Sequence, residues 1–518
     1  MRRGAFIAAV AALTLIAVIR VASTHRVFSA TLDEPIHLAS GYEWLDGAYR
    51  GDVTHPPLSR ILFALPLRLA GVPPPAEPAN MIDRGNQILY DGDHYEKNLA
   101  RGRMGNLVLL VVAIVAVALW ARRAFGDAVA VVAVALFTNV PAILGHAGLM
   151  TTDLSVAATL PLALLALDMV LDCGGKAAAF KSGGSAAAVH IFLGFAVGLG
   201  VLSKLSFLVY FPICALVMIA MRWPPRVKVR GLAVAAGVAL VVVTAGYRFE
   251  IRRPVDVAAD APQFFEAAHI PRALAYVPLP APSLPIGLAQ VRLHDRGGHN
   301  AFLLGKQSRT GWWYYFPVVF FFKTPLPLLI LFLAGAFYRR TREFALIAAA
   351  ILLFAMTASL NIGLRHILPI YAPFSIVAAF GAVALWRRAR LLVIALLAWL
   401  VLGVAVAHPD YLAWFNEVAG RNPARIAVDS NLDWGQDVLR LARVVRERRI
   451  DHLWIVMNNN TRLDRHGIAA EWLPPRTKVS GWVAAGENWT AFTDEYDWLK
   501  AYQPVQRVGK SIRLYHIP

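Results

Sequence analysis

The chain has 518 residues, of which 58% are hydrophobic and 16% charged, and its mean hydropathy is +0.53. This balance lies outside the range of soluble globular proteins and predicts a polytopic membrane protein. The formal net charge of +18 does not indicate nucleic-acid binding, because the basic residues stand at the ends of apolar runs rather than on one soluble domain.

Long apolar segments predict about eleven membrane helices. A helix needs about 20 predominantly apolar residues to cross the hydrocarbon core. We place the helices at 4–22, 104–121, 128–145, 153–171, 189–203, 205–221, 231–247, 313–337, 343–360, 364–386 and 390–408. The predicted fold is an all-α polytopic membrane protein with a small external α/β domain at its C-terminal end.

Basic residues near the predicted helix ends indicate the orientation of the chain. The positive-inside rule assigns the loops richest in Lys and Arg to the cytoplasm. These positions are Arg2, Arg3, Arg122, Arg123, Lys176, Lys181, 222–230, Arg339, Arg340, Arg342, Arg387, Arg388 and Arg390. We therefore expect a multi-pass protein of the cell (inner) membrane, with a cytoplasmic N-terminus and an external or periplasmic C-terminus.

The first predicted external loop, 23–103, carries an adjacent acidic pair, Asp33 and Glu34. Ionisable groups near a membrane are costly unless they are solvated or used. A carboxylate in a partly dry pocket can take a proton from an acceptor hydroxyl, and a second acid can orient that base or hold a cation. The alternative is a solvated helix-capping turn, because acids are favoured near helix N-termini.

Two more polar turns are predicted on the same side of the membrane. His55 precedes Pro56 and Pro57, whose fixed backbone dihedrals hold it where a helical stretch begins. It is a candidate for binding phosphate or a metal, or it marks a simple helix start. Asp153, which follows His146 and Thr152, either lies in the first turn of a helix or contacts substrate or metal.

Three basic side chains on the external side are candidates for contacting a phosphate. Lys204 interrupts an apolar run, and Arg365 and His366 end the segment that begins at Asn361. Arg can bond two phosphate oxygens at once and Lys supplies a point charge. The alternative for Lys204 and Arg365 is snorkelling to lipid headgroups.

Aromatic residues surround a further candidate substrate-binding cation, Lys323. They form the run 312–316 at the start of the eighth predicted helix. Such residues prefer the membrane interface, so a structural belt is the default explanation. Stacking on a sugar or an isoprenoid is the alternative.

The composition changes near residue 408, which divides the chain into two predicted domains. Residues 1–408 form the membrane domain, with external loops 23–103 and 248–311; a loop as long as the second is usually a functional lid or disordered. Residues 409–518 form the external α/β domain, with predicted strands at 425–430, 453–457 and 511–516 and a helix at 437–449. The acidic run 429–437 fails the pattern of a calcium-binding EF-hand and predicts a capped turn, which could still recognise an acceptor.

Taken in chain order, these segments resemble the GT-C type glycosyltransferases of family 39, in its bacterial branch related to protein mannosyltransferases and aminoarabinose transferases. The resemblance spans most of residues 1–440. It is carried by Asp33-Glu34-Pro35, His55-Pro56-Pro57-Leu58, Thr152-Asp153, Gly311-Trp312-Trp313-Tyr314-Tyr315, Lys323-Thr324-Pro325, Asn361-Ile362-Gly363-Leu364-Arg365-His366 and Val428-Asp429-Ser430-Asn431-Leu432-Asp433-Trp434-Gly435-Gln436-Asp437. One departure is His55, which replaces the lysine expected in aminoarabinose transferases.

The resemblance implies an inverting transfer of a hexose or pentose from a polyprenyl-phosphate donor to a protein, lipid or glycan acceptor at the external face. Asp33 would act as general base, and Glu34 would orient Asp33 or the acceptor. Lys204, Arg365 and His366 would stabilise charge on the departing phosphate. The scheme requires no metal, although it leaves room for a divalent cation.

Two other classes of protein are compatible with this composition. A lipid or sugar transporter or flippase requires charges deep within helices and helices broken near the midplane, whereas the charges here cluster at one face. A membrane anchor that displays a binding domain needs only one or two helices. The glycosyltransferase is therefore the leading prediction.

Overall fold

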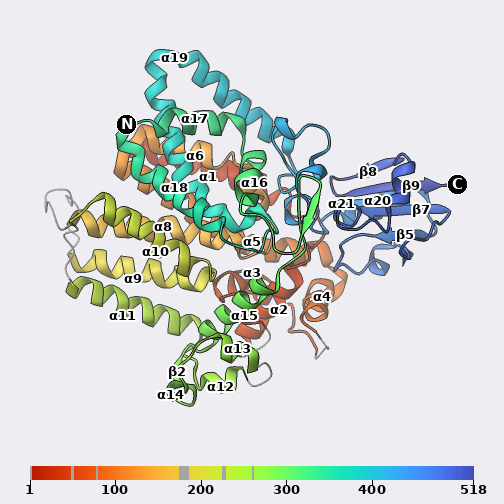
Figure 1. Ribbon diagram of the computed structural model, residues 1–518, viewed down its shortest axis with the longest axis horizontal. Helices are drawn as coiled ribbons and strands as arrows, with labels where there is room; N and C mark the ends of the chain where they lie inside the picture. Colours follow the sequence, from red (N-terminus) through yellow and green to blue (C-terminus); the bar gives the residue numbers. More distant parts are fainter. Residues whose placement is uncertain (1–2, 48–51, 77–79, 174–185, 225–228, 259–261) are drawn as a thin grey trace.

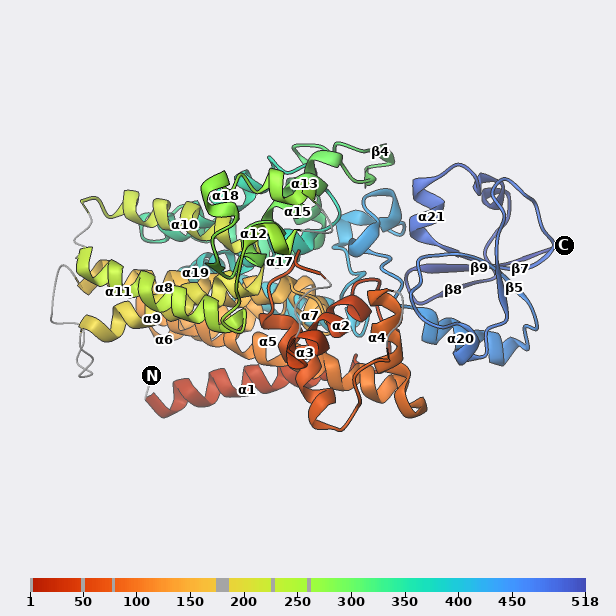
Figure 2. The same cartoon turned by 90° about the horizontal axis from the view of Figure 1, so that it is seen from below.

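The computed structural model describes residues 3–47, 52–76, 80–173, 186–224, 229–258 and 262–518. A body of helices occupies most of the molecule, and a small sheet lies at one end of it (Figures 1 and 2). The two termini lie at opposite ends of the long axis (Figure 2). Of the predicted cytoplasmic positions, Arg2, Lys176, Lys181 and part of the segment 222–230 lie outside the described residues.

Every predicted membrane segment contains a helix. The apolar helices are α1 (Arg3–Ala22), α5 (Tyr95–Phe125), α6 (Asp127–Phe137), α7 (Pro141–Ala147), α8 (Asp153–Cys173), α9 (Ala186–Ser203), α10 (Phe207–Met221), α11 (Val229–Gly246), α16 (Tyr315–Lys323), α17 (Leu326–Ala336), α18 (Arg342–Ala355) and α19 (Tyr371–Ala407). Within the described residues, five helical segments are long and apolar enough to cross a membrane, or seven if each bent pair counts as one span. The count of eleven crossings stays a prediction.

Two segments predicted as single straight helices are broken. Helices α6 and α7 meet at 66°, and α16 and α17 meet at 112°. Pro325 explains the second break, because proline lacks an N–H and disfavours helical dihedrals at the residue before it. Thr324 is accordingly extended, with φ −102° and ψ 132°. This turn places Lys323, the last residue of α16, in contact with the segment after α19.

The segment 23–103, which is predicted to be external, contains three short helices, α2 (Glu34–Leu45), α3 (Leu58–Leu69) and α4 (Met81–Tyr90). Helices α2 and α3 approach closely at Gly41, where an added Cβ would lie 2.1 Å from the carbonyl oxygen of Arg60. Only a residue without a side chain allows this contact. His55, three residues before the start of α3, lies against His37 in the first turn of α2.

The second segment predicted to be external, 248–311, has secondary structure of its own. Its elements are β1 (Ile251–Arg252), α12 (Pro254–Val257), α13 (Pro262–Ala267), α14 (Arg272–Ala275), β2 (Leu279–Pro280), α15 (Ser283–Gly297), β3 (Ala301–Leu303) and β4 (Lys306–Ser308). Strands β1 and β2 pair antiparallel, as do β3 and β4. The segment therefore has a local fold of its own rather than being a plain connection.

A five-stranded sheet with the order β6-β5-β7-β9-β8 closes the chain. Its elements are α20 (Val438–Arg448), β5 (Leu453–Val456), β6 (Ala470–Trp472), β7 (Gly481–Gly486), α21 (Glu487–Phe492), β8 (Gln506–Val508) and β9 (Ile512–Ile517). Strand β5 runs parallel to β6 and β7, and β9 runs antiparallel to β7 and β8. Helix α20 packs Leu441 and Val445 against the sheet residues Leu453 and Leu514.

The strands predicted at 453–457 and 511–516 and the helix at 437–449 are confirmed, but the strand predicted at 425–430 is wrong. That segment forms two 3₁₀ turns, Pro423–Arg425 and Asp429–Asn431. Its apolar residues Ile426 and Ala427 are buried in the core of the helical body instead of in the sheet. Hydrophobicity alone does not distinguish these two kinds of burial.

Candidate active site

Asp33 and Arg365, which are far apart in the sequence, form an ion pair at the start of α2. Asp33 stands at the N-cap position of α2, yet its side chain makes no capping hydrogen bond. Instead, Arg365 Nη1 donates to Asp33 Oδ2 at 2.8 Å. The Asp33 side chain is 33% exposed and that of Arg365 12% exposed, so solvent and substrate can reach the pair. The capping alternative for Asp33 therefore does not account for its position.

A second ion pair extends this contact into the helical body. Lys204 Nζ donates to Asp153 Oδ1 at 2.5 Å, and Arg365 Nη1 lies 3.8 Å from Asp153 Oδ2. Asp153 is the first residue of α8, and Lys204 directly follows the last residue of α9. The four side chains form a continuous row, Asp33–Arg365–Asp153–Lys204, in which two acids balance two cations. We call this row the charge ladder.

Two histidines lie beside the charge ladder as neutral rings. His55 Nδ1 is hydrogen-bonded to Thr152 Oγ1 at 2.9 Å, and the His55 and His37 rings lie 5.0 Å apart. Burial and the nearby Arg60 charge lower the pKa of His37 to about 4. Burial, with His37 and Arg60, also lowers the pKa of His55 well below its ordinary value. The contact with Thr152, which directly precedes Asp153, places His55 next to the charge ladder.

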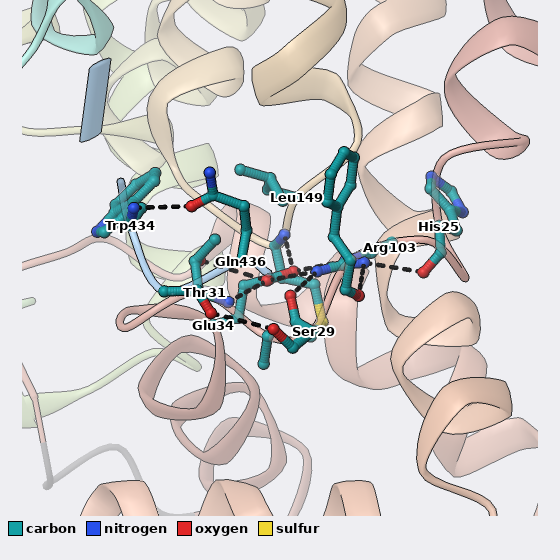
Figure 3. A network of polar contacts seen from close by, with 12 residues as sticks. His25, Ser29, Thr31, Glu34, Arg103, Leu149, Trp434 and Gln436 are labelled. Atoms are coloured by element: carbon teal, nitrogen blue, oxygen red, sulfur yellow. Dashed lines mark hydrogen bonds and ion pairs between the residues drawn. The ribbon is translucent and has the colours of Figure 1, made fainter. Parts of the chain in front are cut away.

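Glu34 lies in a buried network with Arg103 of α5 (Figure 3). Arg103 Nε donates to Glu34 Oε1 and Arg103 Nη2 to Glu34 Oε2, both at 2.8 Å, and both side chains are fully buried. The backbone N–H groups of Met150 and Thr31 also donate to Glu34, each at 2.8 Å. Burial favours the neutral acid, but Arg103 and these donors outweigh it and hold the pKa of Glu34 below its ordinary value.

The remaining donors of Arg103 hold the loop that carries Asp33. They reach the backbone carbonyl oxygens of His25, Phe28 and Ser29 at 2.8–2.9 Å. Glu34 and Arg103 thus join α5, the turn before α8 and the loop before α2 in one satisfied network. This arrangement gives Glu34 a role in fixing the position of Asp33, whereas contact between Glu34 and an acceptor would require the network to open.

Lys323 lies apart from the charge ladder and binds backbone oxygens. Its Nζ donates to the carbonyl oxygens of Leu412 at 2.6 Å and Asn431 at 2.7 Å, and it lies 4.4 Å from the centre of the Phe415 ring. The side chain is buried. These contacts indicate that Lys323 fastens the segment after α19 to the end of α16.

His366 adjoins Arg365 and has unused hydrogen-bonding capacity. The hydroxyl of Tyr210 donates to the backbone oxygen of His366 at 3.0 Å, while the ring atom Nε2 is buried. His366 Nε2, His146 Nδ1 and Arg365 Nε have no hydrogen-bond partner among the residues that the structure describes. Because buried polar atoms are normally satisfied, these nitrogens are compatible with a polar ligand or water at the site.

The segment 429–437, for which the sequence predicts a capped turn, contacts the site directly. Trp434 lies under the Arg365 guanidinium, with 4.2 Å between the guanidinium carbon and the ring centre. Asn431 Oδ1 accepts a hydrogen bond from the backbone N–H of Leu364 at 3.0 Å, and Ser430 Oγ donates to the Ile362 oxygen at 2.6 Å. The sequence feature that could have indicated this contact is Trp434, a large aromatic residue within a run of mostly polar residues.

Asp433, in the same segment, provides a pH-dependent contribution to stability. Burial raises its pKa from 3.8 to about 7, although the backbone N–H groups of Asn488 and Gly435 donate to it. Because the folded state binds the proton more tightly than the unfolded state, stability falls as pH rises through this window. We expect a loss of about 2–3 kcal/mol between pH 5 and pH 8 in thermal unfolding of the wild type.

The Asp433→Asn variant is the control for this pH effect, because it mimics the protonated acid. Its free energy of unfolding should change less than that of the wild type over the same interval. Equal pH dependence in both proteins would show that Asp433 does not titrate there.

A divalent cation would need several ligands at this site. No group of three or more His, Cys, Asp or Glu side chains that could hold a metal ion occurs in the described ranges. In the charge ladder, each acid faces a cationic side chain instead. The donor set therefore fits an anionic ligand better than a metal.

Comparisons with known proteins identify the fold. A family model described as dolichyl-phosphate-mannose-protein mannosyltransferase matches residues 95–247, which contain α5 to α11. The crystal structure of ArnT from Cupriavidus metallidurans bound to undecaprenyl phosphate is 14% identical, with a TM-score of 0.51 over 98% of this chain and 97% of that chain. The archaeal oligosaccharyltransferase AglB from Archaeoglobus fulgidus, in complex with an inhibitory peptide and a dolichol-phosphate, is 14% identical, with a TM-score of 0.47 over 92% of this chain and 69% of that chain. No curated protein sequence matches the chain significantly.

The chain is a membrane protein with the GT-C fold of glycosyltransferases such as ArnT. The resemblance inferred from the order of the sequence motifs is therefore confirmed at the level of this class.

Proposed function

We propose that the protein transfers a sugar from a polyprenyl-phosphate donor to an acceptor hydroxyl at the external face of the membrane, with inversion and with Asp33 as the general base. The observation that carries this proposal is the charge ladder. It joins the start of α2, the start of α8, the end of α9 and the turn before α19 at one site. The acceptor hydroxyl belongs to a protein, lipid or glycan, and the sugar is a hexose or pentose.

In the proposed reaction, the acceptor oxygen attacks the anomeric carbon from the face opposite the phosphate. The bond between this carbon and the phosphate oxygen breaks, and the phosphate leaves with the electron pair. Asp33 takes the proton of the acceptor hydroxyl, while Arg365 and Lys204 stabilise the charge on the phosphate. The phosphate is already a competent leaving group, so the protein chiefly positions the reactants.

The placement of other charges supports an external site. Asp168 and Asp172, near the C-terminal end of α8, pair with Arg123 and Arg222, which come from two of the predicted cytoplasmic ends. Asp153 lies at the opposite end of the same helix. A helix of about 20 residues spans about 30 Å, which is the thickness of the hydrocarbon core. The charge ladder and the positive ends would then lie on opposite sides of the membrane.

Two further observations support the enzyme over a transporter or flippase. The charged residues of the ladder lie at helix ends and in turns rather than at mid-helix positions. The ArnT structure that shares this fold holds undecaprenyl phosphate. A phosphate on a lipid chain is a ligand that Arg365 and Lys204 would be expected to bind in place of their carboxylate partners.

Binding of undecaprenyl phosphate by the purified protein tests the donor site. We expect Arg365→Ala and Lys204→Met each to weaken binding at least about tenfold, because a hydrogen bond to a charged group contributes about 1.5–3 kcal/mol. Arg68→Ala, which removes the exposed partner of Asp46, is the matched control and should bind as the wild type does. Wild-type affinity in both ladder variants would contradict the proposal.

A further inference from the structure

Trp434 lies where the segments of the site meet, although it comes from the part of the chain beyond α19. Its ring is 2% exposed and packs with Leu149 and Leu412. Its backbone oxygen accepts a hydrogen bond from the N–H of Leu32 at 3.2 Å, one residue before Asp33. The ring is also 6.0 Å from that of His146. One side chain thus contacts or adjoins the segments before α2, between α7 and α8, and after α19.

The contact between Trp434 and Arg365 is specific in its geometry. The guanidinium carbon lies 4.2 Å from the centre of the Trp434 ring, within the range of a cation–π interaction. Arg365 Nη1 meanwhile donates to Asp33 and approaches Asp153. The ring therefore supports one face of the guanidinium, while the two carboxylates hold its edge. A guanidinium fixed in this way is oriented before a ligand arrives.

Trp434 is itself held tightly by its own turn (Figure 3). Its backbone N–H donates to Gln436 Oε1 at 2.7 Å, and Gln436 Nε2 donates to the Leu432 oxygen at 2.8 Å. The side chain of the preceding residue, Asp433, accepts from the backbone N–H of Asn488 in α21 at 3.0 Å. The ring position is therefore coupled to the C-terminal sheet region as well as to the helices.

We propose that Trp434 is a positioning residue for the donor phosphate, because it fixes the Arg365 guanidinium in the charge ladder. The inference rests on the proposed function, in which Arg365 contacts that phosphate. It adds that the region after α19 contributes to the geometry of the donor site. Core packing alone would not require a guanidinium to lie over the face of the Trp434 ring.

The test measures binding of undecaprenyl phosphate to purified full-length variants, together with their thermal unfolding. We expect Trp434→Leu to weaken binding about tenfold, because it removes the aromatic face while keeping an apolar side chain. Trp434→Phe keeps an aromatic face and should bind within about threefold of the wild type. Trp120→Leu is the matched control, since Trp120 is fully buried in α5 against Phe344. It should lower thermal stability without changing the affinity.

Wild-type affinity in Trp434→Leu would overturn the inference, as would equal weakening in Trp434→Leu and Trp434→Phe. Equal weakening in Trp120→Leu would show that the loss follows general destabilisation, which also overturns it. If Arg365→Ala retains wild-type binding, the proposed donor site itself fails. If Arg365→Ala loses binding and Trp434→Leu does not, only the positioning role fails.

Discussion

Asp33→Asn is expected to lower sugar transfer by about 10²–10⁴-fold, the usual contribution of a general base. The variant keeps the shape of the side chain but cannot take the acceptor proton. Binding of undecaprenyl phosphate should be retained or become tighter, because the neutral amide no longer competes with the phosphate for the Arg365 guanidinium. The measurement is mass spectrometry of cell-envelope glycans and glycoproteins in cells whose only copy of the protein is the variant.

The matched control is Asp46→Asn, at the other end of α2. Asp46 pairs with Arg68, and both side chains are about one-third exposed. This variant should transfer sugar as the wild type does. Full transfer by a correctly folded Asp33→Asn protein would remove Asp33 from the mechanism, and the charge ladder would then be a structural feature.

Glu34→Gln is expected to destabilise the protein by about 3–5 kcal/mol, because it leaves Arg103 buried without a balancing charge. Both side chains are fully buried, so water cannot solvate the Arg103 guanidinium once its partner is neutral. The measurement is thermal or denaturant unfolding of the purified variant in detergent. Asp46→Asn again serves as control and should change stability by less than about 1 kcal/mol, since exposed pairs contribute little.

A Glu34→Gln protein as stable as the wild type would show that the Glu34–Arg103 network does not hold the loop in place. The network is the reason for assigning Glu34 a positional role. Its loss would be expected to reduce transfer through a displaced Asp33, so activity and stability should fall together.

Most of the helical architecture could be predicted from hydropathy, but its breaks could not. The apolar run 313–337 is long enough for one crossing, and the sequence does not say that Pro325 begins a new helix at 112° to the first. The start of α5 shows the converse error. The apolar run predicts a helix from residue 104, whereas α5 begins at Tyr95, and this polar first part carries Arg103.

The members of the charge ladder could be predicted to lie together, because the predicted topology places them on one side of the membrane. Asp33, Asp153, Lys204 and Arg365 each stand near the end of an apolar segment, so counting crossings brings them to the same face. Which side chains form contacts with one another within that face was not predictable. Nothing local to Glu34 identifies Arg103 as its partner, and the contact between Arg365 and Trp434 depends on how the region after α19 folds back on the helices.

A structure of the protein with bound undecaprenyl phosphate tests the central claim most directly. The account predicts phosphate oxygens within about 3 Å of Arg365 and Lys204 nitrogens, with the Asp33 carboxylate released toward the acceptor side. A phosphate bound away from these cations, with the Asp33–Arg365 and Asp153–Lys204 pairs unchanged, would contradict it.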